Sequence, residues 1–175
     1  MNRVEQTQAA LEALFPAVEQ GETQIDQAAA EESVESEQQT ERLPGVITTP
    51  FEKNGSHLDV LCEPSHVVDI AILLDKNGFF LESIAGVDWL KKDQLEIVYD
   101  YTCYDHDQCR VTVRTAVPRS NPEVPTISLV IPGANWHERE TFDFYGIIFA
   151  GHPDLTRILL PEDADFFPLL KDYMP

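Results

Sequence analysis

Two adjacent stretches decide the fold: Leu95-Glu96-Ile97-Val98-Tyr99-Asp100-Tyr101-Thr102-Cys103 and Cys109-Arg110-Val111-Thr112-Val113-Arg114-Thr115-Ala116-Val117. In both, the odd-numbered positions are mostly apolar, and the even-numbered positions are more polar. This period of two predicts the strands of a β-hairpin, joined by residues 104–108, with the odd-numbered side chains facing the core. The even positions carry carboxylates on the first strand and arginines on the second, which supports the pairing modestly.

The residues before the hairpin predict two more strands and a helix. Short strands are expected at residues 58–62 and 79–87. Between them, Pro64 suits the first position of a helix that ends at Asn77-Gly78. The order β-α-β-β-β predicts an α+β fold over residues 57–131, a sheet with its helix on one face. A further strand is expected around Thr126 to Ile131, among several prolines.

The chain before this domain has a different composition. Residues 1–20 place apolar side chains at helical spacing and predict an amphipathic helix, which Pro16 ends or kinks. Residues 21–56 are interpreted as an acidic, Gln- and Glu-rich linker, because most of this segment lacks large apolar side chains. We therefore expect that removing residues 1 to about 40 leaves the folded domain intact.

The overall charge limits the classes of partner. The 175 residues include 31 acidic and 12 basic side chains, for a formal net charge of -19. Such a surface repels nucleic acid and anionic lipid, and leaves basic protein surfaces as partners. No stretch approaches the ~20 apolar residues of a membrane span, and the N-terminus does not resemble a secretion signal. Three cysteines suit reduced thiols in a cytosol better than a disulfide framework.

Residues 132–175 predict an extended C-terminal tail with one short helix over residues 136–145. Asn135 and Glu138 have the spacing of a capping box, and Gly146 suits the end of the helix. The rest of the tail has sparse signals for secondary structure. Such tails are usually stabilised by lying on another surface.

The predicted helix 136–145 has aromatic residues on two opposite sides, each with a carboxylate: Trp136, Glu140 and Phe144 on one, and Glu138, Phe142 and Tyr145 on the other. A surface helix of a monomer normally has a single apolar face. We interpret this helix as held between its own sheet and another protein. Arg139 and Asp143 have the spacing of an ion pair, and another carboxylate needs a partner from elsewhere in the assembly.

An independent metal-dependent enzyme is the alternative hypothesis, and it would use His106, His137 or His152. Cys103-x-x-His106-x-x-Cys109 has metal-ligand residue types but no evident fourth ligand, so buried thiols are the preferred interpretation. His137, Glu138 and Glu140 lack the two-histidine spacing of a metallopeptidase helix. His152 beside Asp154 is expected to fix a loop by a hydrogen bond.

Two long stretches of the C-terminal third resemble the C-type subunit of NADH:quinone oxidoreductase, the respiratory complex I: residues 132–147 (PGANWHERETFDFYGI) and residues 149–163 (FAGHPDLTRILLPED). The blocks at residues 85–89 (AGVDW) and 171–173 (KDY) are also similar. The resemblance covers about residues 58–175. It departs from the family where Phe167 and Leu170 stand in place of a histidine and an arginine.

The resemblance implies a non-catalytic, peripheral subunit on the cytoplasmic face of a proton-translocating membrane complex. Its C-terminal segment would wrap the large, hydrogenase-like D-type subunit near the quinone site, beside the iron–sulfur B-type subunit. The chain itself would hold no cofactor, metal or catalytic residue. Iron–sulfur clusters and flavin would be in partner subunits, or a nickel–iron site if the host is a related membrane-bound hydrogenase. The expected interface residues are Trp136, Glu138, Arg139, Glu140, Phe142, Asp143, Phe144, Tyr145, His152, Asp154, Arg157, Lys171 and Asp172.

Overall fold

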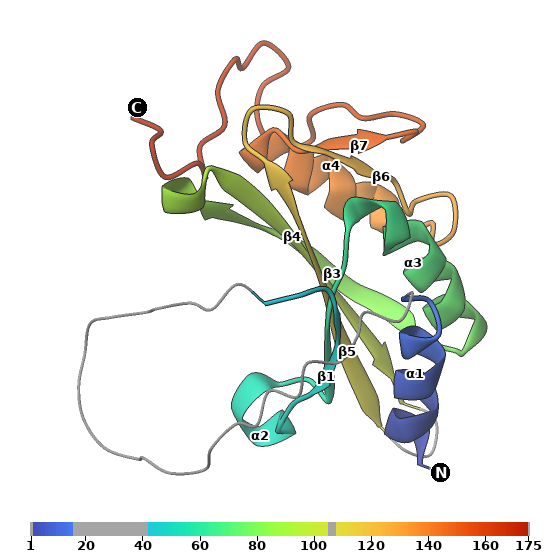
Figure 1. Cartoon of the computed structure of the whole chain (residues 1–175). Coiled ribbons are helices and arrows are strands. Elements are labelled where there is room, and N and C mark those ends of the chain that lie inside the picture. The colour runs from blue at the N-terminus through green and yellow to red at the C-terminus, as the bar shows by residue number, and fades with distance from the viewer. Residues whose placement is uncertain (1, 16–41, 105–107, 175) are drawn as a thin grey trace.

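The computed structural model describes residues 2–15, 42–104 and 108–174. Figure 1 shows a twisted five-stranded sheet in the order β1-β2-β5-β4-β3. Its strands are β1 (Gly45–Thr48), β2 (Leu58–Leu61), β3 (Phe80–Trp89), β4 (Gln94–Cys103) and β5 (Cys109–Pro118). The β2–β5 pair is parallel and the other three pairs are antiparallel. The predicted α+β fold is confirmed.

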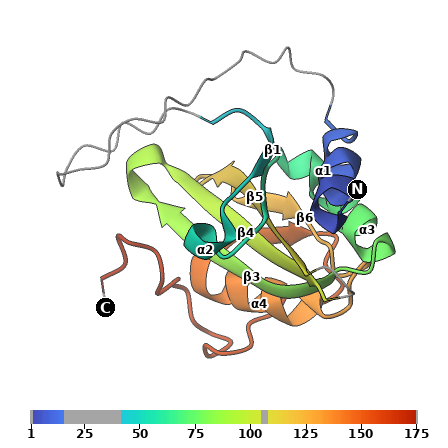
Figure 2. The same ribbon diagram turned by 90° about the horizontal axis from the view of Figure 1, so that it is seen from below.

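Three helices cover one face of this sheet: α1 (Arg3–Glu12), α3 (Val67–Lys76) and α4 (Ala134–Tyr145). Figure 2 shows α1 and α3 side by side at one end and α4 along β3. Single helical turns are α2 (Phe51–Asn54), η1 (Pro64–His66) and η2 (Leu90–Lys92). Next to α4, β6 (Glu123–Pro125) and β7 (Ile148–Ala150) pair in parallel.

The β4–β5 hairpin forms in the predicted register. Leu95 lies opposite Val117 and Cys103 opposite Cys109, and the odd-numbered side chains of residues 95–103 and 109–117 are all buried. The arginines of β5 do find carboxylates, but mostly on other strands. Arg114 lies 2.9 Å from Asp59 of β2 and 3.7 Å from Glu96 of β4, and Arg110 pairs with Glu82 of β3.

The predicted helix after Pro64 is also found. Pro64 opens the turn η1, which leads directly into α3, and α3 ends at Lys76 with Asn77 as its C-cap and Gly78 at a φ of 75°. A left-handed backbone at this position favours glycine. The buried face of α3 is formed by Val67, Ile70, Ala71 and Leu74.

The boundaries of the predicted linker are wrong at its C-terminal end. Residues 45–54, assigned to linker 21–56, contain β1 and α2. The strand is only four residues long, so the polar composition of the segment hides it. It is fixed by its pairing with β2 and by Arg42, whose guanidinium bonds the Asp59 side chain and backbone.

The N-terminal helix is shorter and better packed than predicted. It spans α1 rather than residues 1–20, and residues 16–41 lie outside the described part of the chain. Leu11 of α1 is fully buried in the main core, and Thr7 is also buried. The expectation that residues 1 to about 40 are dispensable therefore loses its basis, because buried apolar side chains stabilise the fold.

Two expectations about the C-terminal part are wrong. Residues 126–131 form turns rather than a strand, and the nearby strand is β6. α4 begins at Ala134 with Gly133 at its N-cap and no side-chain cap, so Asn135 and Glu138 form no capping box. The carboxylate of Glu138 instead accepts a hydrogen bond from the amide of Ile127, which links α4 to these turns. In the described ranges, no helix is long and apolar enough to cross a membrane.

Candidate functional site

The predicted interface residues lie on α4 and on the terminal segment, residues 151–174, which has no helix or strand in its described residues. α4 packs on β3, where Thr141 is buried with its hydroxyl 3.5 Å from the carbonyl of Ile84. The terminal segment then runs outside α4 and returns to the end of the sheet beside η2 (Figure 1). Its position is set by contacts with side chains of the folded body.

Asp143 holds the terminal segment against α4. Its fully buried carboxylate lies 2.8 Å from Nη1 of Arg157 and accepts hydrogen bonds from the amides of residues 158–160 at 3.1, 2.7 and 2.9 Å. Burial alone raises the pKa of Asp143, but the three amides and the guanidinium outweigh it, and the pKa is lowered. The carboxylate is therefore charged and paired within the chain.

The predicted ion pair of Arg139 with Asp143 is wrong. Arg139 instead donates to the carbonyl and hydroxyl of Thr156, at 3.0 and 2.9 Å, and to the carbonyl of Arg157 at 3.3 Å. Its guanidinium also lies 5.3 Å from the centre of the Trp136 ring. Arg139 therefore joins α4 to the terminal segment and packs against the tryptophan.

Glu138 is also satisfied within the chain. It is fully buried and accepts hydrogen bonds from the hydroxyl of Thr126 and, at 2.7 Å, from the amide of Ile127. Burial raises the pKa of Glu138 to about 7, against the opposing effect of these hydrogen bonds. The two buried carboxylates of this helix, Glu138 and Asp143, both have partners within the chain. The expectation that a carboxylate of this helix needs a partner from another subunit is therefore wrong for these two residues.

His152 lies against Glu138, with 3.8 Å between Nε2 and Oε2 and both side chains fully buried. The two ring nitrogens have other partners. Nδ1 accepts from the amide of Asp154 at 3.1 Å, and Nε2 lies 3.3 Å from the carbonyl of Asn135. These contacts fix the loop around His152, as the sequence predicts.

The aromatic residues of α4 are covered to different degrees. Phe142 meets Phe167 edge to face at 6.4 Å, and Arg157 lies over both rings at 5.9 and 5.1 Å. Phe144 is half-buried, and its carbonyl accepts from the amide of Leu169. The chain's own terminal segment therefore contacts α4 at Phe142 and Phe144, where the sequence analysis expected another protein.

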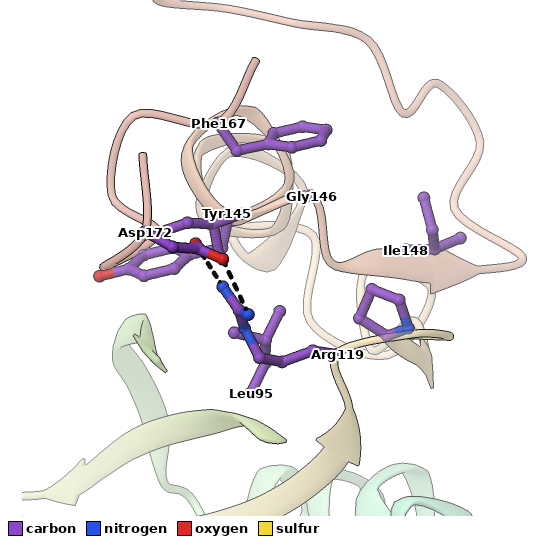
Figure 3. A pocket seen from close by; sticks show the side chains of 9 residues that line it. Leu95, Arg119, Tyr145, Gly146, Ile148, Phe167 and Asp172 are labelled. Atoms are coloured by element: carbon purple, nitrogen blue, oxygen red, sulfur yellow. Dashed lines mark hydrogen bonds and ion pairs between the residues drawn. The ribbon is translucent and has the colours of Figure 1, made fainter. Parts of the chain in front are cut away.

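A second anchor lies where the terminal segment returns to the sheet. Buried Asp88 of β3 lies 3.0 Å from Nε of Arg119 and accepts from the amide of Lys171 at 2.8 Å. Arg119 also bonds Asp172 through both terminal nitrogens, as Figure 3 shows. The hydrogen bond to Asp172 and the charges of both aspartates raise the pKa of Arg119, although burial opposes this.

Beside this anchor is a mostly apolar cavity of about 500 Å³. It is lined by the ring of Tyr145, by side chains of the terminal segment and by residues at the end of the sheet (Figure 3): Leu95, Arg119, Pro122, Tyr145, Gly146, Ile148, Phe167, Leu170 and Asp172. Phe167 and Leu170, the two departures from the family ending, both contribute apolar surface here.

Of the remaining predicted interface residues, Glu140 and Asp154 are exposed, and so is Lys171, whose ammonium lies 5.7 Å from the Trp89 ring. Sequence reasoning missed three partners: Asp88, Arg119 and Thr126. Asp88 lies in the block 85–89 that resembles the family, and this resemblance could have identified it. The other two are distant in sequence, and rules of helical spacing do not find such partners.

Some large apolar side chains of α4 and the terminal segment remain uncovered after these contacts. Trp136 is 63% exposed and Leu159 60%, and Phe166, Leu169 and Met174 are exposed as well. We call these five side chains the apolar set. Exposed apolar side chains on ordered backbone are typical of protein interfaces.

The described residues contain no cluster of three or more potential metal ligands. Cys103 and Cys109 are free, buried thiols on opposite strands, and His106 lies outside the described residues. His137 and His152 have no such cluster around them.

Comparison with known proteins agrees with this architecture. Residues 60–175 match the family described as "Respiratory-chain NADH dehydrogenase, 30 Kd subunit". The C-type subunit of the NADH-quinone oxidoreductase of Roseiflexus sp. (strain RS-1) is 42% identical over 135 residues, covering 74% of this chain and 76% of that protein. The C-type subunit of the F(420)H(2) dehydrogenase of Methanosarcina mazei is 42% identical over 92 residues, covering 52% of this chain and 58% of that one.

Two solved structures have the same fold. The trypsin-resistant fragment (1-134) of Nqo5 superposes with a TM-score of 0.51 and 33% identity, over 56% of this chain and 82% of the fragment. A chain of the archaeal membrane-bound sulfane sulfur reductase superposes with a TM-score of 0.61 and 24% identity, over 67% and 71%. The second likeness concerns the fold alone. With its family match over residues 60–175, this chain belongs to the 30 kDa subunit family of the respiratory-chain NADH dehydrogenase, which includes the C-type subunits of NADH-quinone oxidoreductases.

Proposed function

We propose that this chain is a non-catalytic peripheral-arm subunit of a complex I-type NADH:quinone oxidoreductase. It docks on the large, hydrogenase-like D-type subunit near the quinone site, beside the iron–sulfur B-type subunit, on the cytoplasmic face of the membrane. Iron–sulfur clusters and flavin belong to the partners in this proposal, and none to this chain.

The exposure of Trp136 and Leu159 is the observation that carries the proposal. The backbone around both is held by contacts within the chain: the buried carboxylate of Asp143 with the amides of residues 158–160, and Arg139 with the Trp136 ring and with Thr156. Ordering exposed apolar side chains costs conformational entropy, which contact with a partner offsets. Aromatic residues held in this way are typical anchors of protein interfaces.

The F(420)H(2) dehydrogenase relative supports a second candidate host. Its name gives an electron donor other than NADH, yet it is as similar over its matched length as the Roseiflexus protein. The docking role therefore also fits an equivalent subunit of a membrane-bound [NiFe]-hydrogenase or another related proton-translocating complex.

The test is co-purification of the complex from cells that carry Trp136→Ala with Leu159→Ala. We expect the double variant to lower the yield of assembled complex at least tenfold, while turnover per assembled complex stays unchanged. Leu43→Ala is the matched control, because Leu43 is 71% exposed and precedes β1. Normal assembly with lost turnover would instead indicate a catalytic role.

A further inference from the structure

Cys103 and Cys109 face each other at the loop end of the β4–β5 hairpin. They are the last residue pair of the antiparallel register, and both are odd-numbered, so their side chains point to the same face of the sheet. Both thiols are free and fully buried. Nothing in the docking role described above uses them.

The register brings the two cysteines within disulfide range. Opposed Cα atoms in an antiparallel pair are about 4.5–5.5 Å apart, inside the range of about 4.4–6.8 Å that disulfides span. The Cβ atoms of such pairs, about 4.5–5.5 Å apart, must approach by about 1 Å to join. Cys62, the third thiol, follows β2, and its amide donates to the carbonyl of Arg114 on β5, the residue that pairs with Leu61.

The N-terminal helix α1 covers both thiols. Nη2 of Arg3 donates to Sγ of Cys103 at 2.9 Å, and the buried hydroxyl of Thr7 bonds the sulfur of Cys109. Arg3 also bonds the carbonyl of Asn77, and its guanidinium lies 5.7 Å from the Phe79 ring. The first half of α1 thus lies on the dithiol and on the end of α3.

Burial under α1 makes the dithiol unreactive. It raises the pKa of Cys109 to about 11, and the neighbouring Cys103 adds to this, while Arg3 and Thr7 act in the opposite direction. A neutral, buried thiol is a poor nucleophile. When α1 lifts off, both sulfurs meet water and the first obstacle to reaction is removed.

We propose that Cys103 and Cys109 form an oxidant-sensitive dithiol site, which a hydroperoxide converts to a cross-strand disulfide when α1 opens. One thiol loses its proton and attacks the peroxide oxygen, so that the O–O bond breaks and a sulfenic acid and hydroxide form. The second thiol attacks that sulfur, the S–O bond breaks, and water leaves. In total, two thiols and one hydrogen peroxide give one disulfide and two waters.

Oxidation and the docking of α1 are coupled in this site. The bonds from Arg3 and Thr7 depend on the two sulfurs, and a disulfide is a weaker acceptor in a changed position. The contacts that hold α1 on the sheet protect the dithiol from oxidation. By linkage, formation of the disulfide must weaken these same contacts. The chain thereby has an oxidation-dependent contact between its N-terminal helix and its sheet.

The first test uses the unmodified full-length chain, reduced and then treated with hydrogen peroxide. We expect peptide mapping without reduction to find a Cys103–Cys109 linkage within one chain, lighter by two hydrogens, while Cys62 stays a thiol. Phenylarsine oxide, which binds paired thiols, should protect Cys103 and Cys109 from maleimide but leave Cys62 unprotected. Unreacted thiols at both positions, or links between chains, would overturn the proposal.

The second test asks whether α1 is the cover. Arg3→Ala should speed maleimide labelling of Cys103 and Cys109 about tenfold, since it removes side-chain hydrogen bonds that hold the helix down. Glu12→Ala, on an exposed position of the same helix, should leave the rate unchanged. Equal rates in the wild type and Arg3→Ala would contradict gating by α1, and equal acceleration at Cys62 would indicate general unfolding instead.

Discussion

Glu138 places an ionisable group inside the protein among neutral hydrogen-bond donors. Its folded-state pKa of about 7 lies above its ordinary value of 4.5, so the folded chain holds the proton more tightly than the unfolded chain. This contribution to stability is complete below about pH 4.5 and is lost as pH rises through about 7. Sequence spacing assigned this residue to a capping box and to an aromatic face held between two bodies, but could not show that Thr126 and Ile127 would be its partners.

We predict that Glu138→Gln removes this part of the pH dependence. An amide has no proton to lose and can still accept from the Ile127 amide. At about pH 8 the variant should be about 1–3 kcal/mol more stable than the wild type, with little difference near pH 5. Urea unfolding across this range tests it. Glu140→Gln, an exposed carboxylate of the same helix, is the control, and parallel pH profiles for Glu138→Gln and the wild type would contradict the prediction.

The pH dependence of stability that comes from Asp143 has the opposite sign. Its pKa is lowered in the fold, so its contribution to stability is present above its ordinary value and is lost as pH falls through the folded-state pKa. Asp143→Asn should cost about 3–5 kcal/mol, because it leaves the mostly buried Arg157 guanidinium without its counter-charge. Urea unfolding measures this loss, and faster trypsin cleavage after Arg157 should accompany it. Asp165→Asn, an exposed carboxylate of the terminal segment, should do neither.

At the scale of elements, the contact of α4 with β3 depends on a missing side chain. A Cβ on Gly86 would lie 2.6 Å from Cδ2 of Tyr145, closer than the two atoms tolerate. We predict that Gly86→Ala destabilises the chain by about 1–3 kcal/mol, since the helix must shift from the strand. The cost should fall when Tyr145→Leu makes room, and a double-mutant cycle in urea unfolding measures that coupling. Equal costs in both backgrounds would show that α4 does not rest on this glycine.

The elements that the sequence predicted are those with local signals. The alternation of Leu95 to Val117 indicated both strands and their register, and the terminators Gly78 and Gly146 marked two helix ends. The missed features depend on distant partners. The short strand β1 is paired with β2, and the turns at residues 126–131 are tied to α4 by the hydrogen bond from the Ile127 amide to Glu138. Helical spacing could identify Asp143 as a residue in need of a cation, but not that Arg157 would supply it.

The same distinction applies to the candidate site. The sequence pointed to the helix and the segment on which Trp136 and Leu159 are exposed, since both residues lie in the two stretches that resemble the family. It assigned to an interface several side chains whose contacts are internal, among them Glu138, Asp143 and Arg157. Polar residues in recognisable motifs can build the shape of a surface without touching the partner. The exposed apolar side chains are then the better candidates for contact.

At the scale of the whole molecule, charge of one sign dominates. A net charge of -19 makes the compact chain repel itself, whereas its exposed ion pairs contribute little. Added salt screens both effects, and the repulsion is the larger of the two. Buried pairs such as Arg157 with Asp143 are screened least. Stability should therefore rise with ionic strength rather than fall.

We predict that raising NaCl from about 10 mM to about 150 mM increases the free energy of unfolding by about 1 kcal/mol, because the screening length falls from about 30 Å to about 8 Å. Urea titrations at the two salt concentrations measure it. The matched variant reduces the magnitude of the net charge, from -19 to -11. It changes eight carboxylates to amides: Glu19, Glu22, Asp26, Glu31, Glu32, Glu35, Glu37 and Glu41. Its salt response should be smaller, since less repulsion remains to be screened. A wild type that loses stability with salt would show that ion pairs outweigh the repulsion.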